Sequence, residues 1–440
     1  MRVLLISTYE LGRQPFGLAS PAACIGKDGH DVQCVDTSRT PLTAELIRNA
    51  RLIAFYLPMH TATRLAAPLI QAARRINPDA HLCGYGLYAP LNAAYLRGLG
   101  LETLIGGEFE ESLRRLASAS PVPADLVSLD RIPFSVPDRS HLPPLGGYAK
   151  LIHGAGERVT GYTEASRGCK HLCRHCPVVP VYQGAFRIVP AEIVLADIAN
   201  QAAAGARHIT FGDPDFFNGP THAIRIVEEL HRQHPHLTYD VTIKVEHLLR
   251  HRDLLPTLHS TGCLLITSAA ESVDDDILLR LNKGHTRADF LEAVRLCRSA
   301  GLALSPTFIP FTPWTTWDGY RDLLHVIADH DLIENVAPIQ LALRLLITNG
   351  SLLLELPEIA AIVEPFQHEA LLHRWRHPDP SIDQLAERLM RLVDNSQKQA
   401  EPRARTFARI WEAAQCGVWP DIPILPSRAT IPYLNEPWYC

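Results

Sequence analysis

The sequence predicts an α/β protein with two successive series of alternating strands and helices, followed by a C-terminal part without that alternation. Short apolar runs alternate with helical patterns from residue 1 to about 118, and the alternation returns between 160 and about 347. A length of 440 residues suits about two to three domains. The expected divisions are 1–118, a linker over 119–150, 151–347 and 348–440.

The first series predicts a doubly wound parallel sheet, because strict alternation of strands and helices brings successive strands together in parallel. The expected strands are 2–7, 31–36, 51–57, 81–87 and 102–105. The expected helices are 18–27, 43–49, 62–76 and 108–117. Such sheets bind ligands at the carboxyl ends of their strands. No GxGxxG pattern occurs there, so a nicotinamide cofactor is not expected.

The linker is predicted from its proline content, since proline at that density disfavours helix and sheet alike. The second series then predicts six βα units, fewer than the eight of a closed barrel. Its expected strands are 161–165, 208–212, 238–245, 263–269, 302–309 and 337–345. Its expected helices are 190–204, 221–234, 246–259, 274–282, 288–300 and 317–330. Chemistry in such a partial barrel belongs at the carboxyl ends of the strands.

Residues 348–440 are expected to form a helical and irregular appendage that covers part of the barrel mouth. Helices are predicted over 352–356, 382–397 and 404–414. The remainder is proline-rich.

Composition narrows the class of protein. The chain is 47% hydrophobic and 20% charged with a net charge of −5, which is typical of a soluble globular protein and gives no support for nucleic-acid binding. No apolar run reaches about 18 residues, so no membrane span is expected. The first residues read as a buried strand without a signal-peptide cleavage site. Because the ten cysteines lack paired spacing, we expect a reducing, cytoplasmic location.

One motif carries the chemistry. Cys169, Cys173 and Cys176 stand at CxxxCxxC spacing directly after the first strand of the second series. Three thiolates on one loop can hold an iron–sulfur cluster with one iron left open to a small molecule. A structural zinc site with His171 or His175 as the fourth ligand is the alternative, although zinc loops usually recruit a second ligand pair, which the other cysteines do not form.

With this loop after the first strand of six βα units, the chain resembles the radical S-adenosylmethionine (SAM) superfamily. The preceding domain is similar to that of the branch with an N-terminal cobalamin-binding domain, so the resemblance covers residues 1–347. It implies that Cys169, Cys173 and Cys176 hold a [4Fe-4S] cluster whose open iron is chelated by SAM. One electron, from a donor of the flavodoxin or ferredoxin type, then cleaves SAM to a 5'-deoxyadenosyl radical.

The resemblance also implies SAM-contacting residues. His175 takes the place of an aromatic residue that helps to seat adenine. Residues 211–217 stand where the family binds the SAM amino group, with Asp213 as first choice and Asp215 as second; an ordinary helix N-cap explains such acids too. Further contacts are expected after the third and fourth strands, from Lys244, Glu246, Glu271 and Ser272.

The sequence does not decide whether the N-terminal domain binds cobalamin. The DxHxxG pattern that supplies the lower ligand is absent after the first strand, and His30 lies before the second strand instead. Some family members bind cobalamin without that histidine, and others keep the domain without the cofactor.

The C-terminus resembles that of the CUAEP/CCAEP-tail radical SAM proteins, whose tail reads Cys, then selenocysteine or Cys, then Ala-Glu-Pro. The sequence stops at Cys440, where selenocysteine would come next, so we expect the recorded chain to be cut at a selenocysteine codon. Cys440 is then a catalytic candidate, because vicinal soft ligands suit a metalloid, a metal or a thiol–selenol step.

The leading expectation is a radical SAM enzyme that functionalises an unidentified small-molecule or peptide substrate, by methyl transfer if cobalamin is present. An alternative is transfer of the 3-amino-3-carboxypropyl group of SAM to a soft atom such as arsenic. A non-catalytic iron–sulfur sensor is the alternative from another class. Neither the substrate nor the oligomeric state can be read from the sequence.

Overall fold

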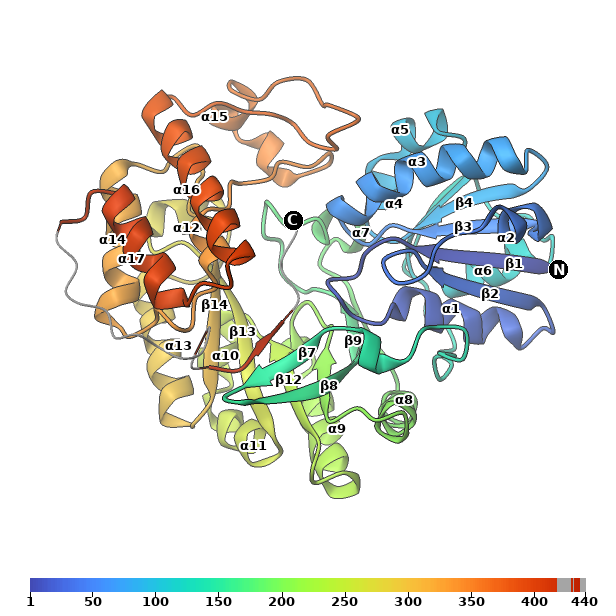
Figure 1. Ribbon diagram of the computed structural model, residues 1–440, viewed down its shortest axis with the longest axis horizontal. Coiled ribbons are helices and arrows are strands. Elements are labelled where there is room, and N and C mark those ends of the chain that lie inside the picture. The colour runs from blue at the N-terminus through green and yellow to red at the C-terminus, as the bar shows by residue number, and fades with distance from the viewer. Residues whose placement is uncertain (418–428, 430, 436–440) are drawn as a thin grey trace.

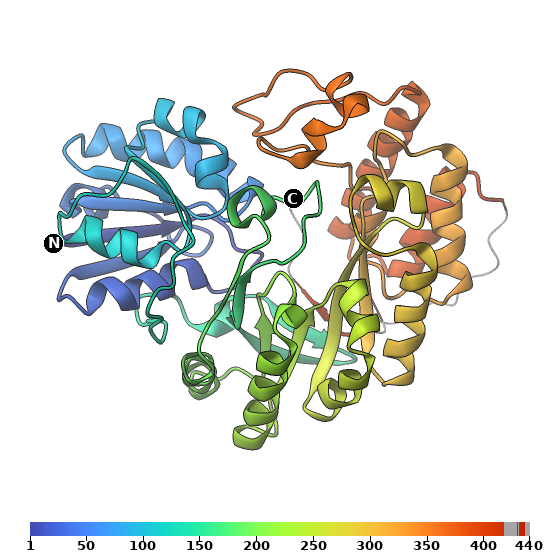
Figure 2. The ribbon, with the colours of Figure 1, turned by 180° about the vertical axis from the view of Figure 1, so that it is seen from behind.

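The computed structural model describes residues 1–417, 429 and 431–435. It contains two large sheets that stand side by side with helices outside them, as Figures 1 and 2 show from opposite sides. The N-terminal sheet has the strand order β2-β1-β3-β4-β5-β6, and the second has the order β14-β13-β12-β11-β8-β7-β15. The predicted fold class, α/β with a helical C-terminal part, is confirmed.

The N-terminal sheet is entirely parallel and has helices on both faces. Its strands are β1 Arg2–Ser7, β2 Asp31–Asp36, β3 Leu52–Tyr56, β4 His81–Tyr85, β5 Thr103–Gly107 and β6 Asp125–Ser128. Its helices are α1 Phe16–Gly26, α2 Ala44–Asn49, α3 His60–Ile76, α4 Tyr88–Leu91, α5 Ala93–Gly98 and α6 Glu110–Ala117. Helices α1 and α6 bury apolar residues on one face, and α2 to α5 do so on the other. This is the doubly wound arrangement.

Strand β6 was not predicted, because it lies within the proline-rich stretch 119–150. Its backbone pairs in parallel with β5, from Leu104 opposite Asp125 to Gly107 opposite Ser128. The prolines at 121 and 123 precede the strand and leave its amide groups available. A strand at the sheet edge also needs only one paired side, which tolerates prolines nearby.

The second sheet is a curled half-barrel. Its parallel strands are β8 Gly156–Thr163, β11 His208–Phe211, β12 Thr238–Thr242, β13 Cys263–Glu271 and β14 Ala303–Phe308, extended on one edge by the antiparallel strands β7 Lys150–His153 and β15 Tyr433–Leu434. A separate two-stranded sheet pairs β9 Ser166–Gly168 with β10 Phe186–Ile188. The helical elements are η1 Leu145–Gly147, α7 Val179–Tyr182, α8 Ala191–Ala203, η2 Phe216–Asn218, α9 Pro220–Gln233, α10 Val245–Arg250, η3 Arg252–Leu254, α11 Leu255–Ser260, α12 Asp275–Arg280, α13 Arg287–Ser299 and α14 Trp317–Asp329.

The predicted sixth strand over 337–345 is wrong. The segment forms a short 3₁₀ helix, η4 Pro338–Leu341, and then only an isolated parallel bridge between Phe311 and Arg344. The Gln340 side chain accepts a hydrogen bond from the Phe308 backbone N–H at 3.1 Å, which replaces the backbone carbonyl of a neighbouring strand. Pro338 lacks an N–H group of its own and favours the first turn of a helix.

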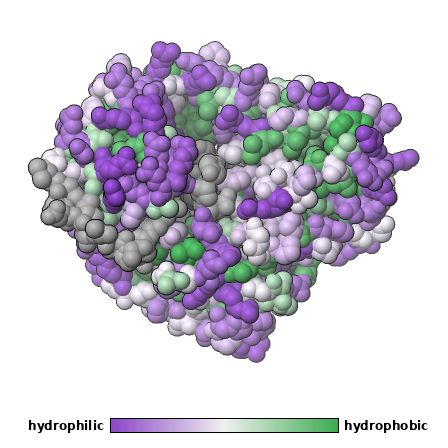
Figure 3. Space-filling model, in the orientation of Figure 1, coloured by the Kyte–Doolittle hydropathy of each residue, from purple (hydrophilic) through white to green (hydrophobic). Residues whose placement is uncertain are grey.

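The C-terminal part closes the open edge of the half-barrel beyond β14. It consists of η5 Leu352–Glu355, α15 Pro357–Ala360, α16 Pro380–Lys398 and α17 Arg403–Ala413. Apolar residues of α16 and α17 join the core cluster that also contains residues of η4 and α14. Their outward faces are largely hydrophilic in Figure 3. Among the described residues, no helix combines the length and apolar composition needed to span a membrane.

Candidate functional site

The cysteine loop lies between β9 and α7, at the carboxyl end of the half-barrel. Gly168 begins it with φ +73°, and a Cβ there would come within 2.5 Å of the Ala185 carbonyl oxygen, so only glycine fits. On one side the Asn218 side chain accepts from the Lys170 N–H and donates to the Gly168 carbonyl. On the other side, Asn282 donates to the Leu172 carbonyl at 2.9 Å. The loop is therefore held from both flanks.

All three cysteines of the loop are free thiols. Cys173 is 8% exposed, and Cys169 and Cys176 pack against an apolar cluster that includes Val178 and Tyr182. Burial raises the pKa of Cys169 to about 11 and that of Cys176 to about 12. Metal binding needs thiolates, so a bound cation would have to displace these protons. Three sulfur donors in an apolar setting suit an iron–sulfur cluster.

A buried charged group flanks the loop. His175 Nε2 lies 3.2 Å from Glu271 Oε1, and the Lys283 ammonium lies 3.4 Å from the same oxygen. Burial opposes the charge on Glu271, but Lys283 and His175 outweigh it and lower the pKa of Glu271 to about 2. Glu271 also has φ +66°, an uncommon conformation for glutamate at the end of a strand. The Glu271 carboxylate is therefore ionised, and it lies beside the cysteine loop.

The two aspartates after β11 have different surroundings. Asp213 accepts hydrogen bonds from the Ala165 N–H at 2.9 Å and the Ser166 hydroxyl at 2.6 Å. Burial raises the pKa of Asp213 to about 7. Asp215 caps η2 through the Phe217 N–H, and its other oxygen faces His171 and His247. Burial acts against the charge of Asp215 too, but both histidines lower its pKa below the ordinary value.

The remaining predicted residues lie at the same end of the barrel. Lys244 is 8% exposed, and its ammonium lies 2.9 Å from His171 Nδ1 and 3.5 Å from Glu246 Oε2. Glu246 also pairs with Arg250. Ser272 accepts a hydrogen bond from the Asp274 N–H, so it stabilises the turn into α12. Lys244 and Glu246 meet on one side of the cysteine loop, and Glu271 lies on the other.

Sequence reasoning missed Lys283 and His247, and weighed His171 only as a zinc ligand. Lys283 follows α12 in a polar connection, and His247 sits in a helix with other polar residues. Neither position has a spacing that distinguishes it from a surface residue. Cys440 lies outside the described residues.

A cavity of about 180 Å³ lies between the N-terminal domain and the cysteine loop. Its walls come mainly from the carboxyl ends of β1, β3, β4 and β5 and from β8, β9 and the turn between them; they include Glu10, Arg13, Tyr56, Gly86, Phe109, Tyr162, Glu164 and Arg167. Arg167 is buried and forms ion pairs with Glu108, Glu110 and Glu164 at 3.0, 2.6 and 2.8 Å. Because Glu108 and Glu110 belong to the N-terminal domain, this network joins the two sheets.

Glu10 in this cavity should destabilise the protein as pH rises. Its carboxyl Oε2 is buried without a hydrogen-bond partner among the described residues, and burial, followed by the nearby Glu164, raises the pKa of Glu10 well above its ordinary value. Because this pKa is higher in the folded protein than in the unfolded chain, the folded protein binds the proton more tightly. The free energy of unfolding therefore falls as the pH rises from the ordinary carboxyl pKa to the raised pKa.

We expect Glu10→Gln to remove that loss and to be more stable than the parent by about 1–3 kcal/mol above the raised pKa, with little difference at acidic pH. Denaturant titrations across pH measure this difference. Glu45→Gln, at an exposed position, is the control. Parallel stability profiles for the parent and Glu10→Gln would show that Glu10 does not carry this proton.

Part of the chain matches a known family model. Residues 163–327 match the family model described as "Radical SAM superfamily". The ribosomal protein uS12 methylthiotransferase of Geobacter sulfurreducens is 28% identical over 185 residues, which are 39% of this chain and 40% of that protein. The hopanoid C-3 methylase of Methylococcus capsulatus is 23% identical over 332 residues, covering 71% of this chain and 64% of that protein. The chain thus spans less than two thirds of these relatives.

Two solved structures share the fold over both sheets. The cobalamin-dependent SAM radical enzyme OxsB, with aqua-cobalamin and SAM bound, superposes with a TM-score of 0.71 and 14% identity, covering 93% of this chain and 70% of that one. The radical SAM methyltransferase TsrM of Kitasatospora setae, with cobalamin and a [4Fe-4S] cluster bound, gives 0.60 and 17% identity, covering 75% of this chain and 70% of that one.

Proposed function

Because this chain carries a radical SAM domain, we propose that it is an enzyme that cleaves SAM reductively at a [4Fe-4S] cluster and uses the product to functionalise a substrate. The observation that carries the proposal is the CxxxCxxC loop, anchored on both flanks at the carboxyl end of the half-barrel. When bound, the cluster supplies one electron to the SAM sulfonium. A low-potential donor of the flavodoxin or ferredoxin type would have to deliver that electron.

We assign Cys169, Cys173 and Cys176 to the cluster. Lys283 and Lys244 stand beside this site, and their positive charges favour the thiolate forms of Cys176 and Cys169, although burial dominates both pKa values. Cys169 and Cys176 are half-buried and pack against an apolar cluster, which limits the contact of the sulfurs with water. The same loop in a structural zinc site would need a fourth ligand. Of the two candidates, His175 pairs with Glu271, and the Nε2 atom of His171 faces Asp215.

The contacts support a revised set of SAM-binding residues. An ammonium group needs an ionised partner. Glu271 meets this condition at neutral pH, whereas Asp213 is close to its pKa and has both oxygens in hydrogen bonds. We therefore propose Glu271 rather than Asp213 for the SAM ammonium. The buried Lys244 ammonium would hold the SAM carboxylate, and His175 keeps its place near adenine.

We place the candidate cobalamin site at the cavity between the N-terminal domain and the cysteine loop. This cavity lies at the carboxyl ends of β1, β3, β4 and β5, where a doubly wound sheet binds its ligand. Tyr56 and Tyr162 form part of its walls. The two solved structures of similar fold hold cobalamin. This sequence lacks the DxHxxG pattern, so no histidine of that motif would serve as lower ligand. We derive no methyl-transfer step through cobalamin.

A second candidate function is transfer of the 3-amino-3-carboxypropyl group to a soft atom held by Cys440, which lies outside the described residues. Strand β15 pairs antiparallel with β7, which is antiparallel to β8, so β15 runs in the direction of β8. Asn435 fixes the end of β15 through two hydrogen bonds to the Lys150 backbone. The described part of the C-terminus therefore runs toward the carboxyl end of the half-barrel, where the cysteine loop lies.

The nucleoside product tests these proposals. Anaerobically reconstituted protein, given SAM and dithionite, is expected to form 5'-deoxyadenosine if the adenosyl group is the reactive part and 5'-methylthioadenosine if the carboxypropyl group is. Liquid chromatography with mass spectrometry measures both. Protein with a fully loaded and reduced cluster that leaves SAM intact would refute the enzyme proposal and favour an iron–sulfur sensor.

A further inference from the structure

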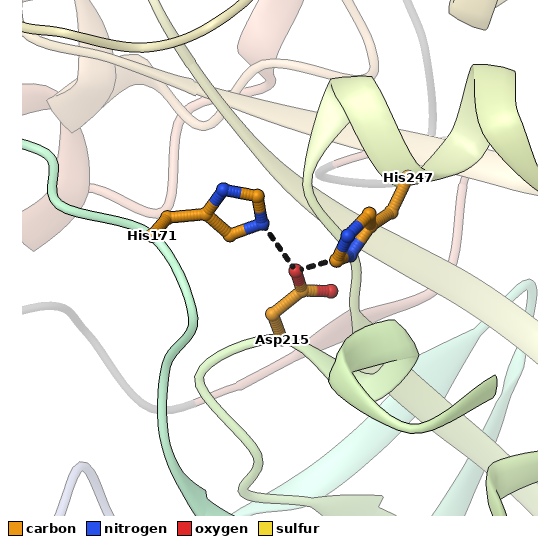
Figure 4. Close-up of side chains that lie close together, drawn as sticks. All are labelled: His171, Asp215 and His247. Carbon is orange, nitrogen blue, oxygen red and sulfur yellow. Dashed lines mark ion pairs between the residues drawn. The ribbon is translucent and has the colours of Figure 1, made fainter. Parts of the chain in front are cut away.

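Two histidines and an aspartate converge beside the cysteine loop (Figure 4). His171 comes from the loop itself, Asp215 from the turn after β11, and His247 from α10 after β12. Asp215 Oδ2 lies 2.6 Å from His247 Nδ1 and 3.5 Å from His171 Nε2. One ligand atom from each residue lies within 4.8 Å of the others. The carboxyl ends of neighbouring parallel strands bring these segments together.

The three facing atoms contact one another and have no further partner among the described residues. His171 Nε2, Asp215 Oδ2 and His247 Nδ1 are all buried, and Asp215 Oδ2 lies within ion-pair distance of both histidines. Asp215 is 1% exposed and His247 is 3% exposed. One carboxylate oxygen thus serves two imidazoles, and a cation between the three atoms would be a partner for all of them.

The donor set and spacing suit one divalent transition-metal ion. Donor atoms around a tetrahedral ion at about 2.1 Å are about 3.4 Å apart. The 3.5 Å separation of Asp215 Oδ2 and His171 Nε2 is close to that value. The 2.6 Å separation of Asp215 Oδ2 and His247 Nδ1 is a hydrogen-bond distance, which a bound ion would have to lengthen. Two imidazoles and one carboxylate are ligands of Zn²⁺ in catalytic sites and of non-haem Fe²⁺, with further positions left for water.

The surroundings of His171 fit metal binding through Nε2. Its Nδ1 would then carry the proton, and Glu246 Oε2 lies 3.6 Å from that nitrogen. A carboxylate behind a ligating histidine is the usual support of such sites. Lys244, which now contacts Nδ1, has Glu246 as its other partner at 3.5 Å, so the ammonium has an alternative position.

We propose that His171, Asp215 and His247 form a mononuclear site for a divalent transition metal, Zn²⁺ or Fe²⁺, distinct from the cluster cysteines. The ion ties the cysteine loop to the ends of β11 and β12, because each ligand belongs to a different segment. Its remaining positions hold water or an anionic group. The site does not depend on SAM cleavage, so it can be tested without turnover.

The test uses full-length protein whose cysteines are already occupied by a reconstituted cluster. After a brief chelator wash, the protein is titrated with Zn²⁺, desalted and analysed for zinc and iron by mass spectrometry. We expect about one zinc per chain in the parent protein. His247→Gln and Asp215→Asn should reduce zinc at least tenfold while the iron content and cluster absorbance remain. His251→Gln changes a histidine whose ring is 5.7 Å from the His247 ring and should bind zinc like the parent.

Cobalt supplies a second measurement that does not rely on a removal variant. Co²⁺ at the proposed site should show visible d–d bands without the intense near-ultraviolet band of thiolate ligation, which separates this site from zinc-like binding by the cysteines. No zinc above background in the parent would overturn the proposal. So would equal zinc in the parent and His247→Gln, or a cobalt spectrum with thiolate character.

Discussion

The Cys173→Ala variant is expected to lose both the iron–sulfur cluster and the cleavage of SAM. Cys173 is the most buried of the three loop cysteines and lies between the other two in sequence. Two remaining thiolates cannot hold a cluster that needs three protein ligands, and no other free cysteine belongs to this loop. Cluster absorbance and iron content should fall to background after reconstitution, and nucleoside formation should fall to the level without enzyme.

Cys416→Ala is the matched control for that experiment. Cys416 is a partly exposed free thiol next to α17, remote in sequence from the loop and packed against the core cluster. It should retain full iron loading and SAM cleavage. If Cys173→Ala reconstituted to the parent's iron content, the ligand assignment would be wrong, and with it the basis of the proposed function.

Replacing Arg167 by methionine is expected to lower the free energy of unfolding by about 3–5 kcal/mol. The Arg167 side chain is 6% exposed, and its partners Glu108 and Glu110 are 0% and 4% exposed. Burial and charge act in opposition here: desolvation disfavours every carboxylate, while Arg167 lowers the pKa of Glu110 below its ordinary value. Without the guanidinium, the carboxylates stay buried and unpaired. Denaturant unfolding measures the loss.

An exposed ion pair provides the contrast. Arg232 pairs with Glu229 on the surface of α9, and Arg232→Ala should leave the unfolding midpoint within experimental error, because exposed pairs contribute little. Arg167→Met should also lose more stability at neutral pH than at acidic pH, where the orphaned carboxylates can take up protons. Equal stability of Arg167→Met and the parent at neutral pH would contradict the network's role.

Most strands could be predicted from the sequence because each is an apolar run bounded by turn residues. The short strands β7, β9, β10 and β15 were not predicted, and two further failures have identifiable local causes. Strand β6 starts just after Pro121 and Pro123, and the prediction treated the residues that follow these prolines as part of the linker. Where a sixth strand was expected, the Gln340 side chain instead accepts a hydrogen bond from the backbone of β14. Such a side-chain contact leaves no periodic pattern in the sequence. Apolar pattern alone cannot distinguish a strand from a 3₁₀ turn with a well-placed amide.

From spacing alone, only the part of the candidate site whose residues are close in sequence was predictable, whereas Asp215, Lys244, Glu246 and Glu271 were expected from the family resemblance. The loop from Cys169 to Cys176 could be recognised from the CxxxCxxC spacing of its cysteines. Lys283 and His247 reach the site from separate βα units, so their roles depend on which strand ends come together. The different surroundings of Asp213 and Asp215 could not be predicted either, because nearby residues of one turn face different partners.

The Arg167 network constrains any exchange of the N-terminal domain between proteins of this architecture. Arg167 lies two residues before the first cysteine, while two of its three carboxylate partners come from the start of α6 in the other sheet. A chimera with a foreign N-terminal domain would therefore need an acidic pair at that same helix start. Without one, Arg167 would keep Glu164 as its remaining partner, and an excess of positive charge would stand near the cysteine loop, where it would shift the reduction potential of the proposed cluster. Under the proposed function, domain compatibility and electron transfer are thus linked through one side chain.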